Sequence, residues 1–400
     1  MTQESALMKS PHAETNSPPS VARLFVSFLR LGTTAFGGPA MVAYIRKMAV
    51  ERNQWLDEAT FRDGVALCQT IPGATAMQTA AYVGLRARGL PGAVVCFVGF
   101  GLPAFCFMAI LSAVYARAHD VPLVLATFQG LRAVTVAIVA NATLTFGKRS
   151  LRGSADIIIA GLAAVLFALK VNPIVVILFA AFLGLLLYGG RRKPKPQTTD
   201  DSAVEVRSRW RVTPLLLVVA AGFALLFMVN RGLFDLGILM VRIDLFAFGG
   251  GFASVPLMYH EVVDVRSWMK EETFMNGIAL GQVTPGPIVI TATFVGYLLY
   301  GIAGAVVATA SVFLPSFLMV VGVVPYFDRL RASDHFNRCM SGILASFVGL
   351  LLSVSIQFAL DVPWDVPRIV LAGAALVALL LGVDVLWVVL AGIALSMMIL

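Results

Sequence analysis

The chain carries the same pattern twice, at a nearly constant offset. Residues 30–38 read Arg-Leu-Gly-Thr-Thr-Ala-Phe-Gly-Gly, and residues 242–250 read Arg-Ile-Asp-Leu-Phe-Ala-Phe-Gly-Gly. Gln-Thr-Ile-Pro-Gly at 69–73 returns as Gln-Val-Thr-Pro-Gly at 282–286. A hydrophobic sequence duplicated with helix-breaking Gly and Pro at matching places is typical of secondary transporters built from internal repeats. The chain is therefore predicted to fold into two related halves.

The composition predicts that both halves lie in a membrane. Of 400 residues, 59% are hydrophobic and 13% are charged, and the mean hydropathy is +0.87. A soluble domain of this size could not hide so much apolar surface. Apolar stretches of spanning length recur along the chain, so we expect an all-α integral membrane protein with about 13 transmembrane helices, some broken by Gly or Pro.

Five segments follow from this pattern. Residues 1–20 form a polar cytoplasmic tail, 21–189 the first repeat, 190–212 a basic cytoplasmic linker, 213–233 a helix that inverts the topology, and 234–400 the second repeat. The basic loops between spans fall on one side, which identifies the cytoplasm. A loop that is basic in one copy loses its excess charge in the other, so the repeats are expected to lie upside down relative to each other.

Other function classes lack their motifs. The four cysteines are scattered, and the sequence has no HExxH, GxSxG or GxxxxGK[ST] motif. We therefore expect no catalytic residue, no metal site, no cofactor and no enzymatic activity. The net charge of +8 lies largely in short loops, so it indicates topology and no nucleic-acid partner.

The two Phe-Gly-Gly motifs, each followed by a Trp and Phe segment and then Gln-x-x-Pro-Gly, resemble the chromate ion transporter family in its long, two-domain form. The resemblance implies export of chromate from the cytoplasm across the bacterial inner membrane, and hence chromate resistance. The alternative function is a carrier that takes up sulfate or another oxyanion. A homodimer is a candidate for the assembly. The first copy departs from the pattern, because it reads Pro-Gly-Ala at 72–74 where the second reads Pro-Gly-Pro at 285–287.

A tetrahedral dianion inside a membrane needs positive charge or convergent N–H donors. Helix N-termini at the breaks can supply such donors, and an Arg at membrane depth should face a partner or a water-filled cavity. Asp244 is a candidate partner for the second Arg. The candidate substrate-binding residues are Arg30, Gly37, Gly38, Pro39, Gln69, Thr70, Pro72, Gly73, Arg242, Phe248, Gly249, Gly250, Gln282, Thr284, Pro285 and Gly286.

Each candidate also has a structural interpretation. The glycines could serve helix packing alone, and the polar side chains could bridge helices. The arginines could snorkel to the surface. Proton coupling through Glu261 or His260 is the minority hypothesis for a coupled ion.

Overall fold

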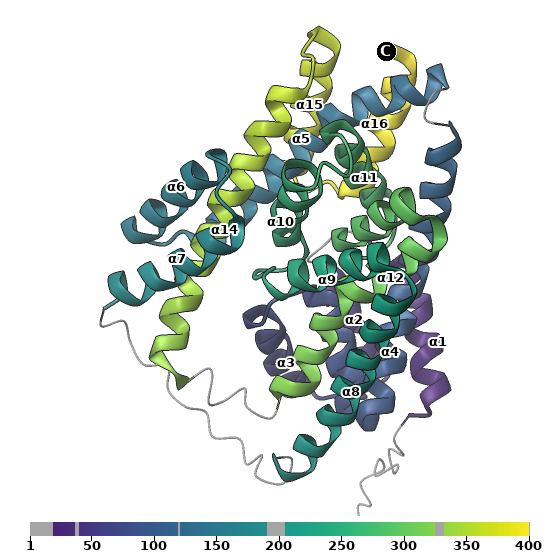
Figure 1. Cartoon of the computed structure of the whole chain (residues 1–400), viewed down its shortest axis with the longest axis vertical. Coiled ribbons are helices and arrows are strands. Elements are labelled where there is room, and N and C mark those ends of the chain that lie inside the picture. Colours follow the sequence, from purple (N-terminus) through teal and green to yellow (C-terminus); the bar gives the residue numbers. More distant parts are fainter. Residues whose placement is uncertain (1–18, 37–39, 119–120, 190–204, 325–331, 400) are drawn as a thin grey trace, which may run out of the picture.

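The computed structural model describes residues 19–36, 40–118, 121–189, 205–324 and 332–399, without the side chains of 122–124 and 205–212. Within these ranges the regular secondary structure is helical, and no strand is formed (Figure 1). The all-α prediction is therefore confirmed. Residues 1–18 of the predicted tail (1–20) and residues 190–204 of the predicted linker (190–212) lie outside the described residues.

The helices of the two halves correspond nearly residue for residue. The long helix α5 (Pro122–Ser150) of the first half matches α14 (Asp334–Asp361) of the second. The remaining matched pairs are α3 (Glu58–Thr70) with α11 (Glu271–Val283), α6 (Ser154–Ala168) with α15 (Val366–Leu380), and α7 (Pro173–Leu187) with α16 (Val385–Ile399). Helix α8 (Glu205–Val229) has no counterpart in the described part of the first half.

Irregular backbone also recurs at matching positions. Single π-helical turns occupy η1 (Lys47–Arg52) and η3 (His260–Val265). Helix α4 (Thr75–Ala118) bends at Gly89, and α12 (Thr291–Val323) bends at Gly301, each with positive φ. Departures from ideal geometry that repeat in both copies show that the duplicated sequence specifies one local structure twice.

The two halves are interlocked. The short helices α6 and α7 pack against α14 of the second half, while α15 and α16 pack against α5 of the first. Glycines allow this approach, because a Cβ atom on Gly342 would lie 2.1 Å from the carbonyl oxygen of Ala180. A Cβ on Gly349 would lie equally close to that of Ala160. Each half therefore completes the packing of the other.

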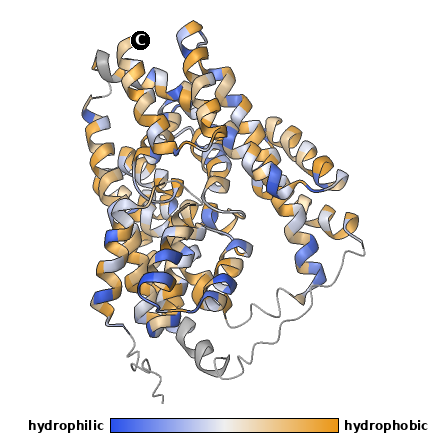
Figure 2. Cartoon of the chain, turned by 180° about the vertical axis from the view of Figure 1, so that it is seen from behind, coloured by the Kyte–Doolittle hydropathy of each residue, from blue (hydrophilic) through white to orange (hydrophobic). Residues whose placement is uncertain are grey.

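The helices present apolar side chains to their surroundings. Hydrophobic residues predominate along many of the helices in Figure 2, and large apolar side chains such as Ile110 and Met228 are 62% and 84% exposed. Four helices of the described chain are long and apolar enough to cross a membrane. The hairpin helices α6, α7, α15 and α16 have 15 residues each. At a rise of 1.5 Å per residue each is roughly 22 Å long, short of the hydrocarbon thickness of about 30 Å.

Four predicted spans are divided, as the Gly and Pro positions indicated. In the first half, α1 (Val21–Thr34) is separated from α2 (Ala40–Arg46), and α3 from α4. In the second half, α9 (Arg231–Leu245) is followed by the single turn η2 (Gly251–Ala253) and α10 (Ser254–Tyr259). Helix α11 is likewise followed by η4 (Ile288–Ile290) and α12.

Candidate functional site

Backbone hydrogen bonds join the breaks of one half to the breaks of the other. The Gly73 N–H donates to the Ala247 carbonyl at 2.8 Å, and the Gly286 N–H donates to the Ala35 carbonyl at 3.0 Å. Gly73 corresponds to Gly286 in the repeat, and Ala35 to Ala247, so the two bonds are equivalent contacts made in opposite senses. The breaks therefore meet around an approximate two-fold axis between the halves.

Gly73 and Gly286 have backbone conformations that side chains rarely tolerate. Their φ angles are +113° and +107°. A Cβ atom on Gly73 would lie 2.1 Å from Ser316 Oγ, and one on Gly286 would lie 2.7 Å from Ala104 Cβ. Both the conformation and the space require glycine here. The sequence pattern Pro-Gly thus produces a sharp, closely packed turn immediately before a helix begins.

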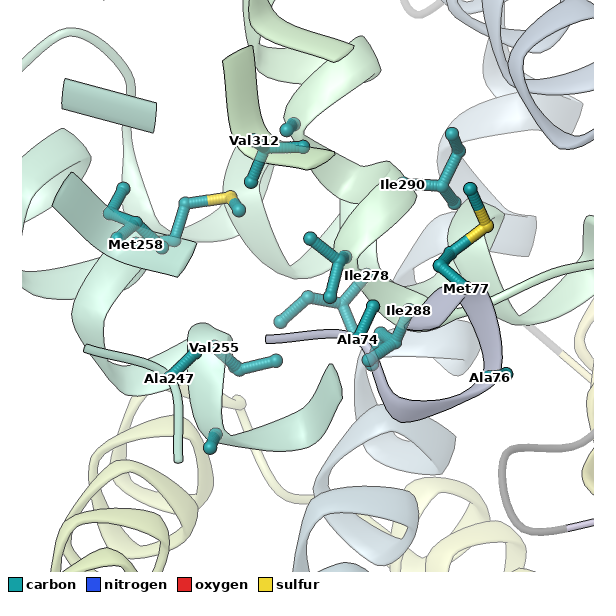
Figure 3. Packing of buried hydrophobic residues seen from close by; sticks show 14 of the residues in the cluster. Ala74, Ala76, Met77, Ala247, Val255, Met258, Ile278, Ile288, Ile290 and Val312 are labelled. Atoms are coloured by element: carbon teal, nitrogen blue, oxygen red, sulfur yellow. The ribbon is translucent and has the colours of Figure 1, made fainter. Parts of the chain in front are cut away.

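A third break adjoins these two turns. A Cβ on Gly250 would lie 3.4 Å from Thr75 Oγ1 at the start of α4, and one on Gly251 would lie 3.3 Å from Val289 in η4. Figure 3 shows the apolar side chains around this centre, with Ala74 from the first half and Ala247 and Ile288 from the second. The first N–H groups of a helix lack intrahelical partners, and its N-terminus carries partial positive charge. Two such ends, of α4 and of η4 with α12, come together here.

One buried polar chain makes this centre asymmetric. Asp244 Oδ2 accepts hydrogen bonds from the Ser316 N–H at 2.9 Å and from Ser316 Oγ at 2.7 Å. Ser316 Oγ in turn accepts from the Ala74 N–H at 2.9 Å. Gln78 Nε2 donates to the Pro72 carbonyl at 2.5 Å. The repeat positions that correspond to Asp244 and Ser316 hold Gly32 and Ala104, so only the second half supplies this carboxyl group.

Arg242 lies beside the centre and pairs with a different carboxylate from the one considered in the sequence. Its Nη1 is 3.5 Å from Glu261 Oε1, and Arg266 Nε is 3.5 Å from the other oxygen of Glu261. Asp244 instead faces Ser316. Arg242, Glu261 and the start of α7 at Asn172 line a cavity of about 10 Å³, which is room for one water. This conformation is closed to a tetraoxo anion at that point.

Two first-half candidates have exposed side chains. The Arg30 side chain is exposed on α1 and forms no ion pair with the described residues. Gln69 is exposed near the end of α3. The candidates Gly37, Gly38 and Pro39 lie outside the described residues. The structure therefore brings together the Pro-Gly turns and the second Phe-Gly-Gly motif, whereas no hydrogen bond or ion pair joins the Arg30 or Gln69 side chain to them within the described residues.

The remaining candidates have local partners. The hydroxyls of Thr70 and Thr284 donate to carbonyls of their own helices, to Leu67 at 2.7 Å and to Gly281 at 3.0 Å. A hydroxyl has one hydrogen, so these threonines do not donate to an anion in this conformation. Gln282 Nε2 is buried and has no hydrogen-bond partner among the described residues.

The second Phe-Gly-Gly motif is held by packing. A Cβ on Gly249, which has a φ of +97°, would lie 2.2 Å from the Phe146 ring of α5. Phe248 is partly buried against the core. Pro72 and Pro285 are buried within the two turns.

Sequence reasoning missed Ser316 and assigned Asp244 a different partner. A usable signal was present, because Leu-Pro at 102–103 and at 314–315 match between the copies while the next residue changes from Ala104 to Ser316. Gly32 changes to Asp244 at another matched position. Both positions hold a small apolar residue in the first copy and a polar residue in the second. Two such polar changes in one copy of a repeat indicate that the two side chains contact each other.

The matched halves, the broken helices and the apolar exterior define a multi-pass membrane transporter of the internal-repeat class. The sequence model of the chromate transporter family matches residues 22–185 and 234–397, one match for each half. The chain belongs to this family, in its long form with two transporter units. The two matches start and end close to the repeat boundaries derived above.

Full-length and single-unit relatives support this assignment. The chain is 43% identical to an uncharacterized transporter of Methanocaldococcus jannaschii over 98% of both proteins. It is 32% identical to a chromate transport protein of Cupriavidus metallidurans, over 90% of this chain and 88% of that protein. An uncharacterized transporter of Bacillus subtilis is 32% identical over 34% of this chain and 79% of its own length. No solved structure matches the chain.

Proposed function

We propose that the protein exports chromate from the cytoplasm by alternating access of its two halves. The observation that carries the proposal is the reciprocal pair of hydrogen bonds from Gly73 to Ala247 and from Gly286 to Ala35. They place the N-termini of two broken helices at one point between the halves. Partial positive charge and N–H groups without intrahelical partners at such ends suit a tetrahedral oxyanion without the desolvation cost of a full charge.

The order of the helices supports an inverted arrangement. In the first half, the two broken spans form one pair: α1 with α2, and α3 with the part of α4 before its bend. The part of α4 after the bend and α5 form a second pair, and α6 and α7 form a third. Such pairs return the chain to the side on which it started. The unmatched helix α8 then carries the chain across once, so the second half begins from the opposite side. Inverted repeats around a central site allow that site to face either side in turn.

The membrane potential alone can drive the proposed export. A dianion that leaves an inside-negative cell gains about 4.6 kcal/mol at roughly 100 mV. That free energy corresponds to about three decades of concentration. Uptake of the same dianion would need coupled cations. An inside-negative membrane potential therefore favours the export direction.

The test is chromate flux in proteoliposomes that contain the purified protein. We expect efflux of labelled chromate that increases when the interior is made negative and that is absent from protein-free liposomes. The reduction of labelled chromate flux by unlabelled sulfate, added outside or inside the liposomes, measures selectivity between the two oxyanions. Sulfate flux without chromate flux would assign the site to the alternative carrier. Absence of both fluxes from folded protein would contradict the proposal.

A further inference from the structure

Asp244 is the one carboxyl group that touches the central turns of the described chain, and it is fully buried. Its exposed fraction is 0%. Oδ2 is occupied by the two donors of Ser316, whereas Oδ1 has no hydrogen-bond partner. Gln78 Oε1 is a second buried acceptor without a partner. Both groups lie next to Gly73, since a Cβ there would be 2.9 Å from Gln78 Nε2 and 3.0 Å from Asp244 Oδ2.

No described cation neutralises this carboxyl group. Arg242 is on the same helix but is directed to Glu261. Helices α10 and α12 contain no Asp, Glu, Lys or Arg. The titratable residue of α10 is Tyr259, whose hydroxyl donates to Glu271. On α4 the charged residues are at 86, 88 and 117, at the bend and at the far end. An isolated carboxylate in such surroundings is costly and becomes neutral by binding a proton.

We infer that Asp244 is the proton-binding residue of the transport cycle and takes up one proton with each oxyanion. This inference rests on the proposed function. An ionised Asp244 at the N-terminus of α4 would repel a dianion, while the protonated acid would not. Because such linkage is reciprocal, anion binding also favours protonation. The proton comes from water on the side to which the centre is open, and it returns to water on the other side.

The other titratable candidates, Glu261 and His260, are less suited to this role. Glu261 is already paired, because Arg242 Nη1 and Arg266 Nε each lie 3.5 Å from one of its carboxylate oxygens. His260 lies 3.7 Å from Asp264, which itself is 3.1 Å from Lys170 Nζ. These side chains contact one another and the neighbouring basic residues, and no hydrogen bond joins them to Ser316, Gln78 or the central turns in the described part of the chain. One proton per dianion leaves one net negative charge, so an inside-negative potential still drives export.

The first test is the variant Asp244→Asn, whose amide oxygen still accepts from Ser316 but cannot release a proton. In wild-type proteoliposomes we expect a chromate gradient to move protons in the same direction, as detected by a trapped pH-sensitive dye. In Asp244→Asn we expect that proton movement to vanish and net efflux to fall. Chromate–chromate exchange should persist and lose its pH dependence, because exchange uses only the protonated form.

Two further measurements test the protonation of Asp244. The wild-type protein at neutral pH should show an infrared band of a protonated carboxylic acid that is missing from Asp244→Asn. The variant Ser316→Ala removes one donor to the carboxylate, so half-maximal exchange should shift upward by about one pH unit. This variant also serves if Asp244→Asn fails to fold, which size-exclusion chromatography would show.

The outcomes separate the two proposals. If the wild type moves no chromate, the proposed export is wrong, and the infrared band still tests the protonation of Asp244. If the wild type moves chromate while Asp244→Asn retains proton movement and pH dependence, the inference is wrong and the export proposal stands. Loss of exchange in a folded Asp244→Asn protein would likewise contradict the inference.

Discussion

Replacing Gly73 with Val should abolish chromate flux. A Cβ at this position would lie 2.1 Å from Ser316 Oγ, and the φ of +113° is unfavourable for any branched side chain. Backbone strain of this kind costs about 1–3 kcal/mol, and overpacking typically adds about 1–3 kcal/mol. The turn would move, and the hydrogen bond to Ala247 would be lost with it. The measurement is chromate flux in proteoliposomes, normalised to the amount of folded protein.

The matched control is Gly161→Val on α6. A Cβ on Gly161 meets nothing within 4 Å, so the substitution should leave flux near the wild-type value. Gly286→Ala should be milder than Gly73→Val, because its added methyl group meets only Ala104. Wild-type flux in Gly73→Val would mean that the central turn is not part of the transport path.

Replacing Gly342 or Gly349 with Leu should cause the largest loss of stability. Each position touches the backbone of a hairpin helix from the other half, with a Cβ that would lie 2.1 Å from a carbonyl oxygen. A Leu side chain would force α14 away from α6 and α7, because backbone cannot yield as a flexible side chain does. We expect a loss of about 3 kcal/mol or more, which lies in the tail of single-substitution effects. Thermal unfolding followed by size-exclusion chromatography in detergent measures it.

Gly373→Leu is the control for this pair. Gly373 lies on α15, where an added Cβ meets nothing within 4 Å. Its unfolding temperature should stay close to that of the wild type. If Gly342→Leu and Gly373→Leu unfold at the same temperature, the interlocked packing of the two halves does not contribute to stability as described.

Much of the fold followed from the duplicated motifs. Gly and Pro at matching depths predicted the broken helices, and the breaks occur between α3 and α4 and between α11 and α12 as expected. Periodicity could not show that α6 and α7 pack on α14. This packing between the two halves depends on close backbone contact at Gly342 and Gly349. An isolated glycine in an apolar helix could contact many different helices, so the sequence does not identify its partner.

The site was predictable in its backbone and less so in its side chains. Pro72-Gly73 and Pro285-Gly286 were identified because helix breakers inside apolar spans have few structural uses. Arg30 was selected by its depth along the chain, but depth alone does not tell which side of a helix faces the interior. Asp244 was assigned to Arg242 because they are close in sequence, whereas residues two apart on a helix point in different directions.

The central claim, that the two halves are inverted around one site, is tested most directly by accessibility from the two sides of the membrane. In a background lacking Cys68, Cys96, Cys106 and Cys339, single cysteines would replace Arg88 and its repeat counterpart Tyr300, both exposed at the helix bends. An impermeant maleimide would then be applied to right-side-out and to everted membranes. We predict labelling of Arg88→Cys from the cytoplasmic face and of Tyr300→Cys from the opposite face. Labelling of both from the same face would contradict the inverted arrangement.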